Sequence, residues 1–195
     1  MSHIHDRRHQ PSPFLVENID LLPKGRALDL AMGGGRNAVY LSKIGYEADG
    51  IDISREAVDA ALALARKSGV HLKADIQDLE GRVHFDKGVY DVIICFNYLH
   101  RPLIPKMKDA LRTGGIIVYE TYIVDQARFG RPRNPNHPLK RNELLHMFQE
   151  FRCLRYREGI IESRKALAGI VAEKMVAVNG LKLVEDPIFS EEIEK

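Results

Sequence analysis

The sequence predicts an α/β fold, a doubly wound and mostly parallel sheet with helices on both faces. Short apolar runs, typical of buried strands, alternate with amphipathic helical segments along most of the chain, and this alternation favours right-handed βαβ crossovers. The first apolar run leads directly into three consecutive glycines at 33–35, which indicate a tight strand-to-helix turn. The first three expected strands also end at or next to an aspartate, which places acidic groups along one edge of the sheet.

The first half of the chain supplies three strands and two crossover helices. The expected elements are, in order, an amphipathic stretch at 14–22, a strand at 26–31, a helix at 36–44, a strand at 47–53, a helix from Ser54 to Gly69 and a short strand at 70–73. Ser54 is expected to be an N-cap because its hydroxyl can accept a hydrogen bond from the first helical turn. Ala57, Val58 and Ala61 recur at the spacing of one helix face, which that helix turns toward the sheet.

The second half begins with the strongest strand signal and becomes harder to interpret. The segment YDVIICF at 90–96, which is apolar from Val92 onward, predicts a buried parallel strand, and proline at the start of a helix is favourable. The expected elements are the strand at 90–96, a helix from Pro102 through Leu111, a strand at 114–121, a loop at 122–138, a helix from about Lys140 to Phe148, and strands at 151–161 and 167–178. The last segment has helix-favouring alanines, but its position after a short polar turn favours a hairpin partner.

Length and charge limit the possible functions. At 195 residues the chain has the size of one domain, and we expect residues 1–195 to form it, with residues 1–13 flexible and the loop at 122–138 acting as a lid. A net charge of +2 argues against a polyelectrolyte partner such as a nucleic acid. The chain has no apolar run long enough to span a bilayer and its start is polar, so we expect a cytoplasmic protein that does not bind membranes.

Polar residues cluster where the expected strands end. In an open parallel sheet, ligands bind beyond the carboxyl ends of the strands. The residues at those ends are Asp29 through Gly35, Asp52, Asp75 with Ile76, Asn97 through Arg101, and Glu120 through Tyr122. A functional site is therefore expected along this edge.

The residue types at this edge suit an adenosyl sulfonium ligand. Glycines let a ligand lie against bare backbone at a positively polarised helix start, and the buried Asp29 needs a partner that a ligand ammonium would supply. Asp52 suits a ribose diol, while Asp75 could accept from an exocyclic amine with Ile76 packing on the base. Together these groups describe S-adenosylmethionine. The alternatives are that the glycines only tighten the turn, that Asp52 caps the following helix, and that Asp75 is a solvated loop residue.

A nicotinamide dinucleotide is a competing ligand. Residues 33–38 also satisfy the pattern GxGxxA, and Asp52 follows at about the expected distance. However, a pyrophosphate at this helix start would be repelled by Asp29, and 195 residues leave little room for a separate catalytic domain. S-adenosylmethionine is therefore favoured over NAD.

The segment LDLAMGGGRNAVYLSKIGYEADGIDIS resembles the class I S-adenosylmethionine-dependent methyltransferases, and its Gly-Arg-Asn ending is similar to the branch that includes the tellurite-resistance methyltransferases. The segment YDVIICFNYLHRPLIPKMKDALRTGGIIVYET and the later HPLKRNELLHMF are also similar to this group. The resemblance implies a Rossmann-like sheet of seven strands whose last strand is antiparallel. It also implies that the acidic and glycine positions bind S-adenosylmethionine and release S-adenosylhomocysteine.

The resemblance assigns a donor-binding set and marks two departures. The expected donor-binding residues are Asp29, Ala31, Gly33, Gly35, Arg36, Asn37, Asp52, Ile53, Asp75, Ile76 and Asn97. The family usually has glycine where this chain has Ala31 and often cysteine where it has Met32. A methyl group at 31 is tolerable if that residue keeps a negative φ.

No residue is assigned a catalytic role, because methyl transfer mainly needs alignment and a base is required only when the acceptor must lose a proton. Tyr98, His100 and Tyr122 are candidates, since they follow the fourth and fifth strands. His100 has a local capping role as its alternative. No metal site is expected, because His3, His5 and His9 lie in a terminus that we expect to be disordered.

We therefore expect methyl transfer to a small-molecule acceptor, with thiols, chalcogen oxyanions and small acids as the classes considered. Arg128, Arg131, Arg133 and His137 in the expected lid would favour an anionic acceptor, or they belong to a solvated charged loop. The alternatives are an NAD-binding oxidoreductase and a noncatalytic sensor of S-adenosylmethionine. Methylation of RNA is disfavoured because no separate binding module accompanies these arginines. The oligomeric state is not predicted.

Overall fold

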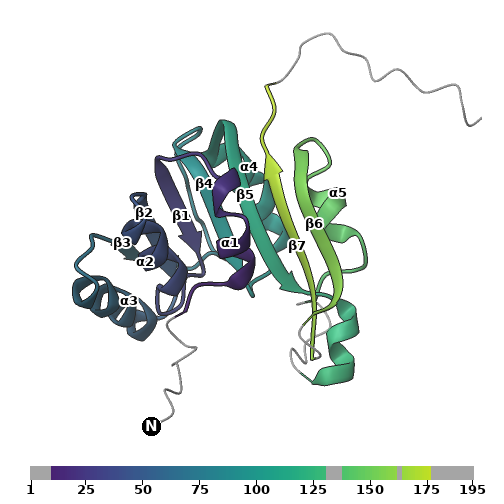
Figure 1. The fold of residues 1–195 in the computed structure, drawn as a ribbon, viewed down its shortest axis with the longest axis horizontal. Coiled ribbons are helices and arrows are strands. Elements are labelled where there is room, and N and C mark those ends of the chain that lie inside the picture. The colour runs from purple at the N-terminus through teal and green to yellow at the C-terminus, as the bar shows by residue number, and fades with distance from the viewer. Residues whose placement is uncertain (1–9, 131–137, 162–163, 177–195) are drawn as a thin grey trace, which may run out of the picture.

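A seven-stranded mixed sheet forms the centre of the computed structural model, which describes residues 10–130, 138–161 and 164–176 (Figure 1). The strands lie in the order β3-β2-β1-β4-β5-β7-β6. Their bounds are β1 Arg26–Leu30, β2 Glu47–Asp52, β3 Lys73–Ile76, β4 Tyr90–Phe96, β5 Leu111–Tyr122, β6 Arg152–Ile161 and β7 Lys165–Glu173. The first five strands are parallel, and β7 pairs antiparallel with both β5 and β6. The Rossmann-like sheet with an antiparallel last strand is therefore confirmed.

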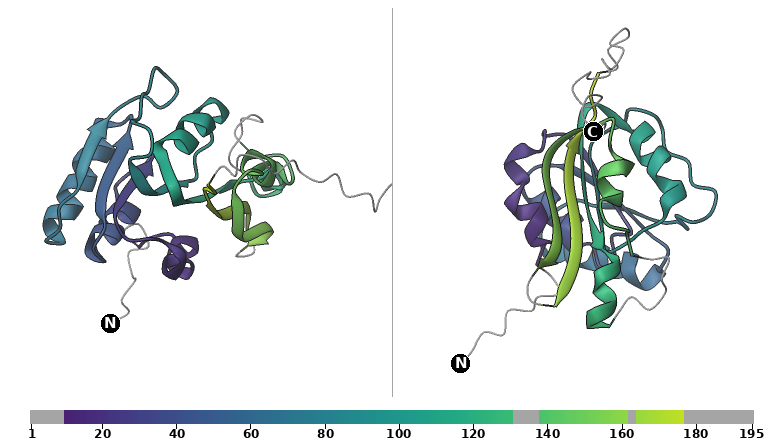
Figure 2. Two further views of the ribbon diagram at one scale, coloured as in Figure 1. Left: turned by 90° about the horizontal axis from the view of Figure 1, so that it is seen from above. Right: turned by 90° about the vertical axis from the view of Figure 1, so that its right-hand side faces the viewer.

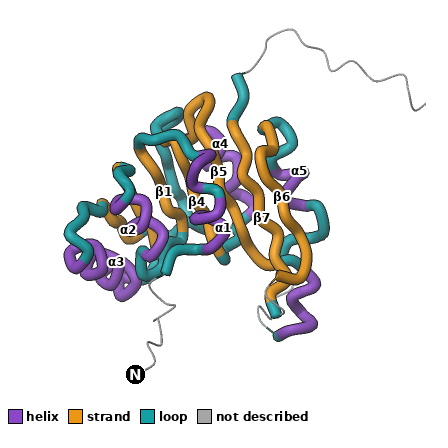
Figure 3. The backbone as a smooth tube through the Cα atoms, in the orientation of Figure 1, coloured by secondary structure: helices purple, strands orange, loops and turns teal. Residues whose placement is uncertain are grey.

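Helices cover both faces of the sheet (Figure 2, right). The α-helices are α1 Pro13–Glu17, α2 Arg36–Lys43, α3 Arg55–Lys67, α4 Ile104–Ala110 and α5 Glu143–Met147, and the 3₁₀-helices are η2 Ile19–Leu21, η3 Arg101–Leu103 and η4 Val124–Phe129. Helices α1 to α3 contribute to one hydrophobic cluster, and α4 and α5 to the other. Figure 3 shows the strands of the sheet continuing side by side between these helices.

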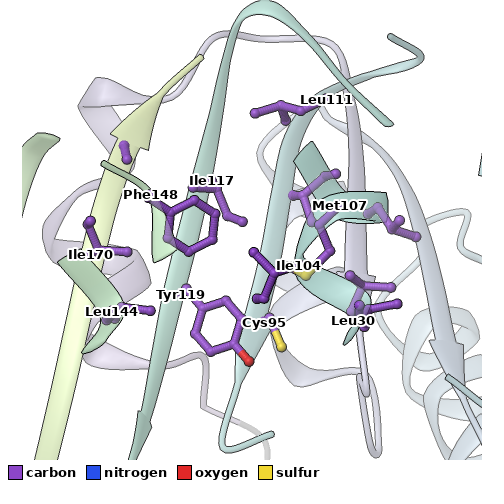
Figure 4. Packing of buried hydrophobic residues seen from close by; sticks show 14 of the residues in the cluster. Leu30, Cys95, Ile104, Met107, Leu111, Ile117, Tyr119, Leu144, Phe148 and Ile170 are labelled. Carbon is purple, nitrogen blue, oxygen red and sulfur yellow. The ribbon is translucent and has the colours of Figure 1, made fainter. Parts of the chain in front are cut away.

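Successive side chains of β4 and β5 point to opposite faces of the sheet, and so they enter the two clusters alternately. Cys95 of β4 and Tyr119 of β5 lie in the same cluster as Met107 of α4 and Phe148, which follows α5 (Figure 4). The rings of Tyr119 and Phe148 have centroids 6.3 Å apart. All seven residues of β4 are buried, which explains why its sequence is apolar apart from Asp91, whose carboxylate pairs with Arg112 and accepts from the Arg26 N–H.

The helix after β2 begins as expected. The Ser54 hydroxyl accepts a hydrogen bond from the backbone N–H of Ala57 at 3.2 Å, which confirms Ser54 as the N-cap of α3. Val58, Ala61 and Ala65 are its buried face, and Ser68 precedes Gly69, which has φ +68°. Sequence patterns within a single helix were therefore sufficient to place this element.

The third strand lies three residues later than predicted. Residues 70–73 were expected to be extended, whereas β3 runs from Lys73 to Ile76. Leu72 is buried in the cluster formed by α1 to α3, so the chain first fills the core and then joins the sheet. Pairing with β2 begins only at Asp49 opposite Lys73.

Several other boundaries differ from the prediction because pairing partners lie far away in sequence. Leu111 was expected to end a helix, but it pairs with Tyr90 and begins β5. The predicted strand at 114–121 is therefore longer, and the expected helix from Pro102 is divided into η3 and α4. The amphipathic stretch at 14–22 is likewise divided between α1 and η2, and the helix at 140–148 shortens to α5. The strand expected at 167–178 is β7, which begins at Lys165 and ends at Glu173, and residues 177–178 lie outside the described residues.

The region after β5 is only partly the long loop that was expected. Its first residues form η4, and Gln126 anchors this turn to the hairpin because its Oε1 accepts from the backbone N–H of Ala166 at 2.7 Å. Ile123 and Leu139 form a parallel bridge across the base of this region. Residues 131–137 lie outside the described residues, and the lid remains a prediction.

Within the described ranges, no helix combines the length and apolar character needed to cross a membrane.

Met32 and Gly50 share one volume in the core. Met32 is 5% exposed, and a Cβ placed on Gly50 would lie 2.1 Å from its sulfur atom. That distance is far below van der Waals contact. Glycine at this position of β2 therefore leaves the space that the Met32 side chain occupies.

We expect Gly50→Ala to lower the free energy of unfolding by about 1–3 kcal/mol, because the added methyl group must displace Met32 in a packed core. Urea denaturation monitored by circular dichroism measures this change. Gly34→Ala is the matched control, since no atom lies within 4 Å of its Cβ position, and it should change stability by less than about 0.5 kcal/mol. Equal effects of the two substitutions would contradict the packing argument.

Candidate active site

Two adjoining cavities lie at the carboxyl ends of β1, β2 and β4. The first, which we term the glycine-loop cavity, has a volume of about 390 Å³. It is lined by Asp29, Ala31, Met32, Gly33, Gly34, Arg36, Asn37, Phe96, Asn97 and Tyr98. The second, the Asp52 cavity, has about 500 Å³ and is lined by Ala31, Asp52, Ile53, Gln77, Asp78, Leu79, Glu80 and Tyr98. Ala31 and Tyr98 belong to both, so the two cavities form one crevice along the edge of the sheet.

The three glycines after β1 serve different purposes. No atom lies within 4 Å of the Cβ positions of Gly33 and Gly34, so the backbone there is open to a ligand in the cavity. Gly35 lies outside the cavity lining and has φ +73°, and a Cβ on it would lie 2.5 Å from the Cβ of Ala61 in α3. The third glycine therefore allows α2 and α3 to approach each other.

Asp29 is a buried carboxyl group at the end of β1. It is 2% exposed, and its Oδ2 accepts a hydrogen bond from the backbone N–H of Ala38 in the first turn of α2 at 3.2 Å. Burial raises the pKa of this carboxyl to about 8, although the Ala38 N–H and the Arg36 charge act in the opposite direction. The first turn of α2 thus supplies one hydrogen bond to the buried Asp29 carboxyl. A cation in the cavity would favour the ionised form of Asp29.

Asp52 connects the glycine loop to the start of α3. Its Oδ2 accepts from the Gly33 N–H at 2.8 Å, and its Oδ1 accepts from the Ser54 N–H at 2.9 Å. The alternative role at the start of the helix is therefore realised. Each carboxylate oxygen can accept a further hydrogen bond, and Asp52 lines the cavity named after it.

Two non-glycine residues at the crevice have a left-handed backbone conformation. Ala31 has φ +53° and Asn97 has φ +56°, so the condition of a negative φ, under which a methyl group at 31 is tolerable, is not met. The left-handed conformation costs an alanine roughly 1–2 kcal/mol, because its Cβ approaches the following carbonyl. Such strain is common where a backbone must present itself to a ligand.

Asn37 lines the glycine-loop cavity and also holds the N-terminal segment by a hydrogen bond. Its Oδ1 accepts from the Ser12 N–H at 2.8 Å, and both residues are buried. The bond joins positions 25 residues apart. No signal in the sequence distinguishes this tether from the donor contact that was predicted for Asn37.

Asp75 and Ile76 lie outside both cavities. The Asp75 carboxylate is 61% exposed and lies 3.9 Å from the Lys73 ammonium, and its contact with a base stays a prediction. The residues after β3, from Gln77 to Glu80, line the Asp52 cavity instead. Sequence reasoning missed them because it ended the strand three residues too early.

The three catalytic candidates are not brought together. Tyr98 lies in the crevice, and its hydroxyl is buried without a hydrogen-bond partner in the described part of the chain. His100 lies outside the cavities, and its carbonyl accepts from Leu103 at the start of η3. The proposed side-chain cap is absent there. Tyr122 lines a third cavity.

This third cavity, which we term the β5 cavity, adjoins the glycine-loop cavity. Its volume is about 740 Å³, and its lining comprises Gln10, Pro11, Ser12, Pro13, Arg36, Asn97, Glu120, Tyr122, Arg157, Ile161, Lys165 and Leu167. Arg36 and Asn97 belong to both cavities. A ligand in one cavity would therefore lie next to a ligand in the other.

Two charges of the β5 cavity, those of Arg157 and Lys165, come from residues that sequence reasoning did not select. Arg157 and Lys165 lie on the β6–β7 hairpin, and only the register of that hairpin places them opposite β5. Of the cations expected in the lid, Arg128 lies in η4, whereas Arg131, Arg133 and His137 lie outside the described residues. His3, His5 and His9 do too. Among the described residues, no three His, Cys, Asp or Glu side chains gather as metal ligands.

Comparison with known proteins identifies relatives of this chain. Residues 27–115 match a family described as a methyltransferase domain. The chain is 29% identical over 122 residues to a ubiquinone biosynthesis O-methyltransferase of Shewanella halifaxensis, covering 58% of this chain and 52% of that protein. It is 32% identical over 109 residues to a ribosomal protein L11 methyltransferase of Thermus thermophilus, covering 55% and 42%. The chain spans about half the length of these curated relatives.

Solved structures share the fold. TehB from Haemophilus influenzae superimposes with a TM-score of 0.70 at 20% identity, covering 82% of this chain and 61% of TehB. A geranyl diphosphate C-methyltransferase from Streptomyces coelicolor, solved in complex with S-adenosyl-L-homocysteine, gives a TM-score of 0.64 at 15% identity, covering 82% and 76%.

We expect Asp52→Ala to weaken the binding of S-adenosylhomocysteine at least about tenfold. The substitution removes charge-assisted hydrogen bonds of about 1.5–3 kcal/mol each and releases Gly33. Isothermal titration calorimetry measures the affinity. Asp86→Ala, which removes an 85% exposed carboxylate, is the control and should bind normally. An unchanged affinity of Asp52→Ala would show that this carboxylate does not hold the ribose.

We expect Asp29 to lose its proton when the ammonium group of the ligand binds. With a pKa of about 8 in the free protein, most Asp29 side chains are protonated at neutral pH, and a nearby cation lowers the pKa. Calorimetry with S-adenosylhomocysteine in two buffers of different ionisation enthalpy should therefore report the release of up to about one proton per site.

Asp29→Asn is the matched variant and should bind without this release. Its stability gives a second readout. Because the folded protein holds the Asp29 proton more tightly than the unfolded chain, the wild-type free energy of unfolding should fall as pH rises from about 4 to about 8. The Asp29→Asn variant should lack this pH-dependent contribution to the free energy of unfolding. Identical proton release from both proteins would contradict the assignment.

Proposed function

Since this chain carries a class I S-adenosylmethionine-dependent methyltransferase domain, we propose that it transfers a methyl group to a small, anionic acceptor held in the β5 cavity. In this proposal, the glycine-loop and Asp52 cavities hold the donor. Asp29 faces the donor ammonium and Asp52 its ribose. The open backbone at Gly33 and Gly34 contacts the part of the donor that lies between its ammonium group and its ribose.

The observation that carries this proposal is the junction of the cavities at Arg36 and Asn97. Methyl transfer from a sulfonium is an in-line displacement, in which the acceptor attacks the methyl carbon opposite the sulfur. Holding both reactants in that geometry can supply roughly 7–11 kcal/mol of the barrier reduction. Two adjoining cavities with a shared wall provide such alignment.

The size and charge of the β5 cavity support a small anionic acceptor. Its volume of about 740 Å³ lies within the usual range for small-molecule sites. Arg36, Arg157 and Lys165 contribute three positive charges to the lining, and Glu120 contributes one negative charge. A carboxylate or oxyanion on the acceptor would therefore be attracted. Thiols, chalcogen oxyanions and small acids remain the classes proposed.

Transfer is tested by incubating the protein with methyl-labelled S-adenosylmethionine and a panel of thiols, selenite, tellurite and small hydroxy acids. Each carboxylic acid is paired with its uncharged amide. We expect label in at least one acceptor, and we expect the acid to have a KM lower than its amide by about tenfold, because it forms a charge-assisted hydrogen bond.

Calorimetry with S-adenosylhomocysteine and with NAD accompanies this assay. Binding of NAD alone would favour the oxidoreductase. Binding of S-adenosylhomocysteine without transfer to any acceptor would favour the noncatalytic sensor. Faster transfer to the amides than to the acids would contradict the anionic acceptor.

A further inference from the structure

Three strands at the β5 cavity are bridged by an ion pair that crosses a glycine. Glu120 on β5 and Arg157 on β6 are both opposite Gly169 on β7, which lies between them. The guanidinium Nε and Nη2 atoms of Arg157 donate to Glu120 Oε2 at 3.0 and 2.6 Å. A Cβ on Gly169 would lie 3.3 Å from that oxygen and 2.9 Å from the Phe14 ring. The missing side chain therefore makes room for the bridge.

Helix α1 fixes the guanidinium group from the other side. The Phe14 ring centroid lies 4.4 Å from the Arg157 guanidinium carbon, and the Arg157 Nη1 atom donates to Glu17 Oε2 at 3.2 Å. Glu17 is 57% exposed, whereas Glu120 is 9% exposed. Arg157 thus has an outer carboxylate in solvent and an inner carboxylate in the cavity lining.

The inner carboxylate has one oxygen that remains available. Both hydrogen bonds from Arg157 go to Oε2 of Glu120, and Oε1 accepts none from the described residues. The backbone of Glu120 also lies beside the junction of the two cavities, because its carbonyl accepts from the Asn97 N–H at 2.9 Å. Because Glu120 lines the β5 cavity, an acceptor bound in that cavity can meet this carboxylate oxygen.

Burial raises the pKa of Glu120 above its usual value, and the hydrogen bonds and charge of Arg157 limit the rise. A carboxylate with a raised pKa is a stronger base than an exposed glutamate, which suits it to accept a proton near neutral pH. The other candidates fit this role less well. Burial raises the pKa of the Tyr98 phenol, which opposes its ionisation, and His100 lies outside the cavities.

We propose that Glu120 accepts a proton from the acceptor during methyl transfer, and that the acceptor is therefore an anionic compound with a protonated hydroxyl or thiol. In this step the O–H or S–H proton moves to Glu120 Oε1, and the freed electron pair forms a bond to the methyl carbon. The bond from that carbon to sulfur breaks, and its electrons remain on sulfur as neutral S-adenosylhomocysteine forms. This inference rests on the proposed function.

The test compares Glu120→Gln with Glu17→Gln in the full-length protein. Both remove a carboxylate from Arg157, but only Glu120 lines the cavity. The donor is labelled S-adenosylmethionine, and the acceptors are 4-hydroxybenzoate, 3-mercaptopropionate and selenite. Selenite is the control acceptor, because its selenium lone pair can attack without loss of a proton. For the hydroxy or thiol acid that the wild type methylates, we expect Glu120→Gln to lower kcat about 100-fold or more. Glu17→Gln should leave kcat within about twofold.

Two further readouts separate a base from a structural residue. The wild-type kcat/KM should fall as pH decreases through the Glu120 pKa, since the base must be unprotonated, and this acidic limb should be absent in Glu120→Gln. Glu120→Asp should retain the limb. The affinity for S-adenosylhomocysteine should stay within about twofold in all variants.

The outcomes distinguish this inference from the proposed function. If the wild type methylates a hydroxy or thiol acid and Glu120→Gln does so equally well, Glu120 is not the base and the proposed function stands. If the wild type methylates selenite alone, the same conclusion follows. If it binds S-adenosylhomocysteine but methylates none of the probes, the assignment of Glu120 and the acceptor class both fail. Should Glu120→Gln not fold, a wild-type profile without an acidic limb would overturn the inference.

Discussion

The hydrogen bond between the buried Asp29 carboxyl and the Ala38 N–H sets the geometry on which the rest of the site depends. It ties the end of β1 to the first turn of α2, so that the glycine loop has a fixed path between them. The same turn of α2 presents Arg36 to both cavities, and it presents Asn37 to Ser12. A carboxyl group in the sheet thereby organises a helix, a loop and the N-terminal wall of the β5 cavity.

Asp52 extends this arrangement to the second strand. Because it accepts from Gly33 and from Ser54, it holds the glycine loop and the start of α3 in one network. The backbone between these anchors has little freedom, which is consistent with the positive φ of Ala31. Anchoring of this kind stabilises a strained conformation that an isolated chain would leave. The open surface of Gly33 and Gly34 thus lies between two hydrogen-bonded anchors.

Local sequence patterns predicted most of the fold, and pairing between distant segments explains the rest. The apolar run of β4 and the face of α3 depend on neighbouring residues, so their positions could be inferred. The start of β3 could not, because Leu72 first fills the core. The position of Asp29 and Asp52 beside the cavities could be inferred from the strand ends, and their contacts with the donor stay predictions. The bridge between Glu120 and Arg157 was not, since it depends on the register of a hairpin 37 residues later.

The contact between Met32 and Gly50 has a consequence for how this domain can vary. The Met32 thioether fills the space in which a side chain at position 50 would otherwise lie. A larger residue at 50 therefore needs a smaller or displaced side chain at 32. A homologue with a shorter residue at 32 has room for alanine at 50, whereas one that retains methionine must move its thioether to admit that methyl group. These two sites should change together during divergence, and a graft of either strand into another member would have to transfer both.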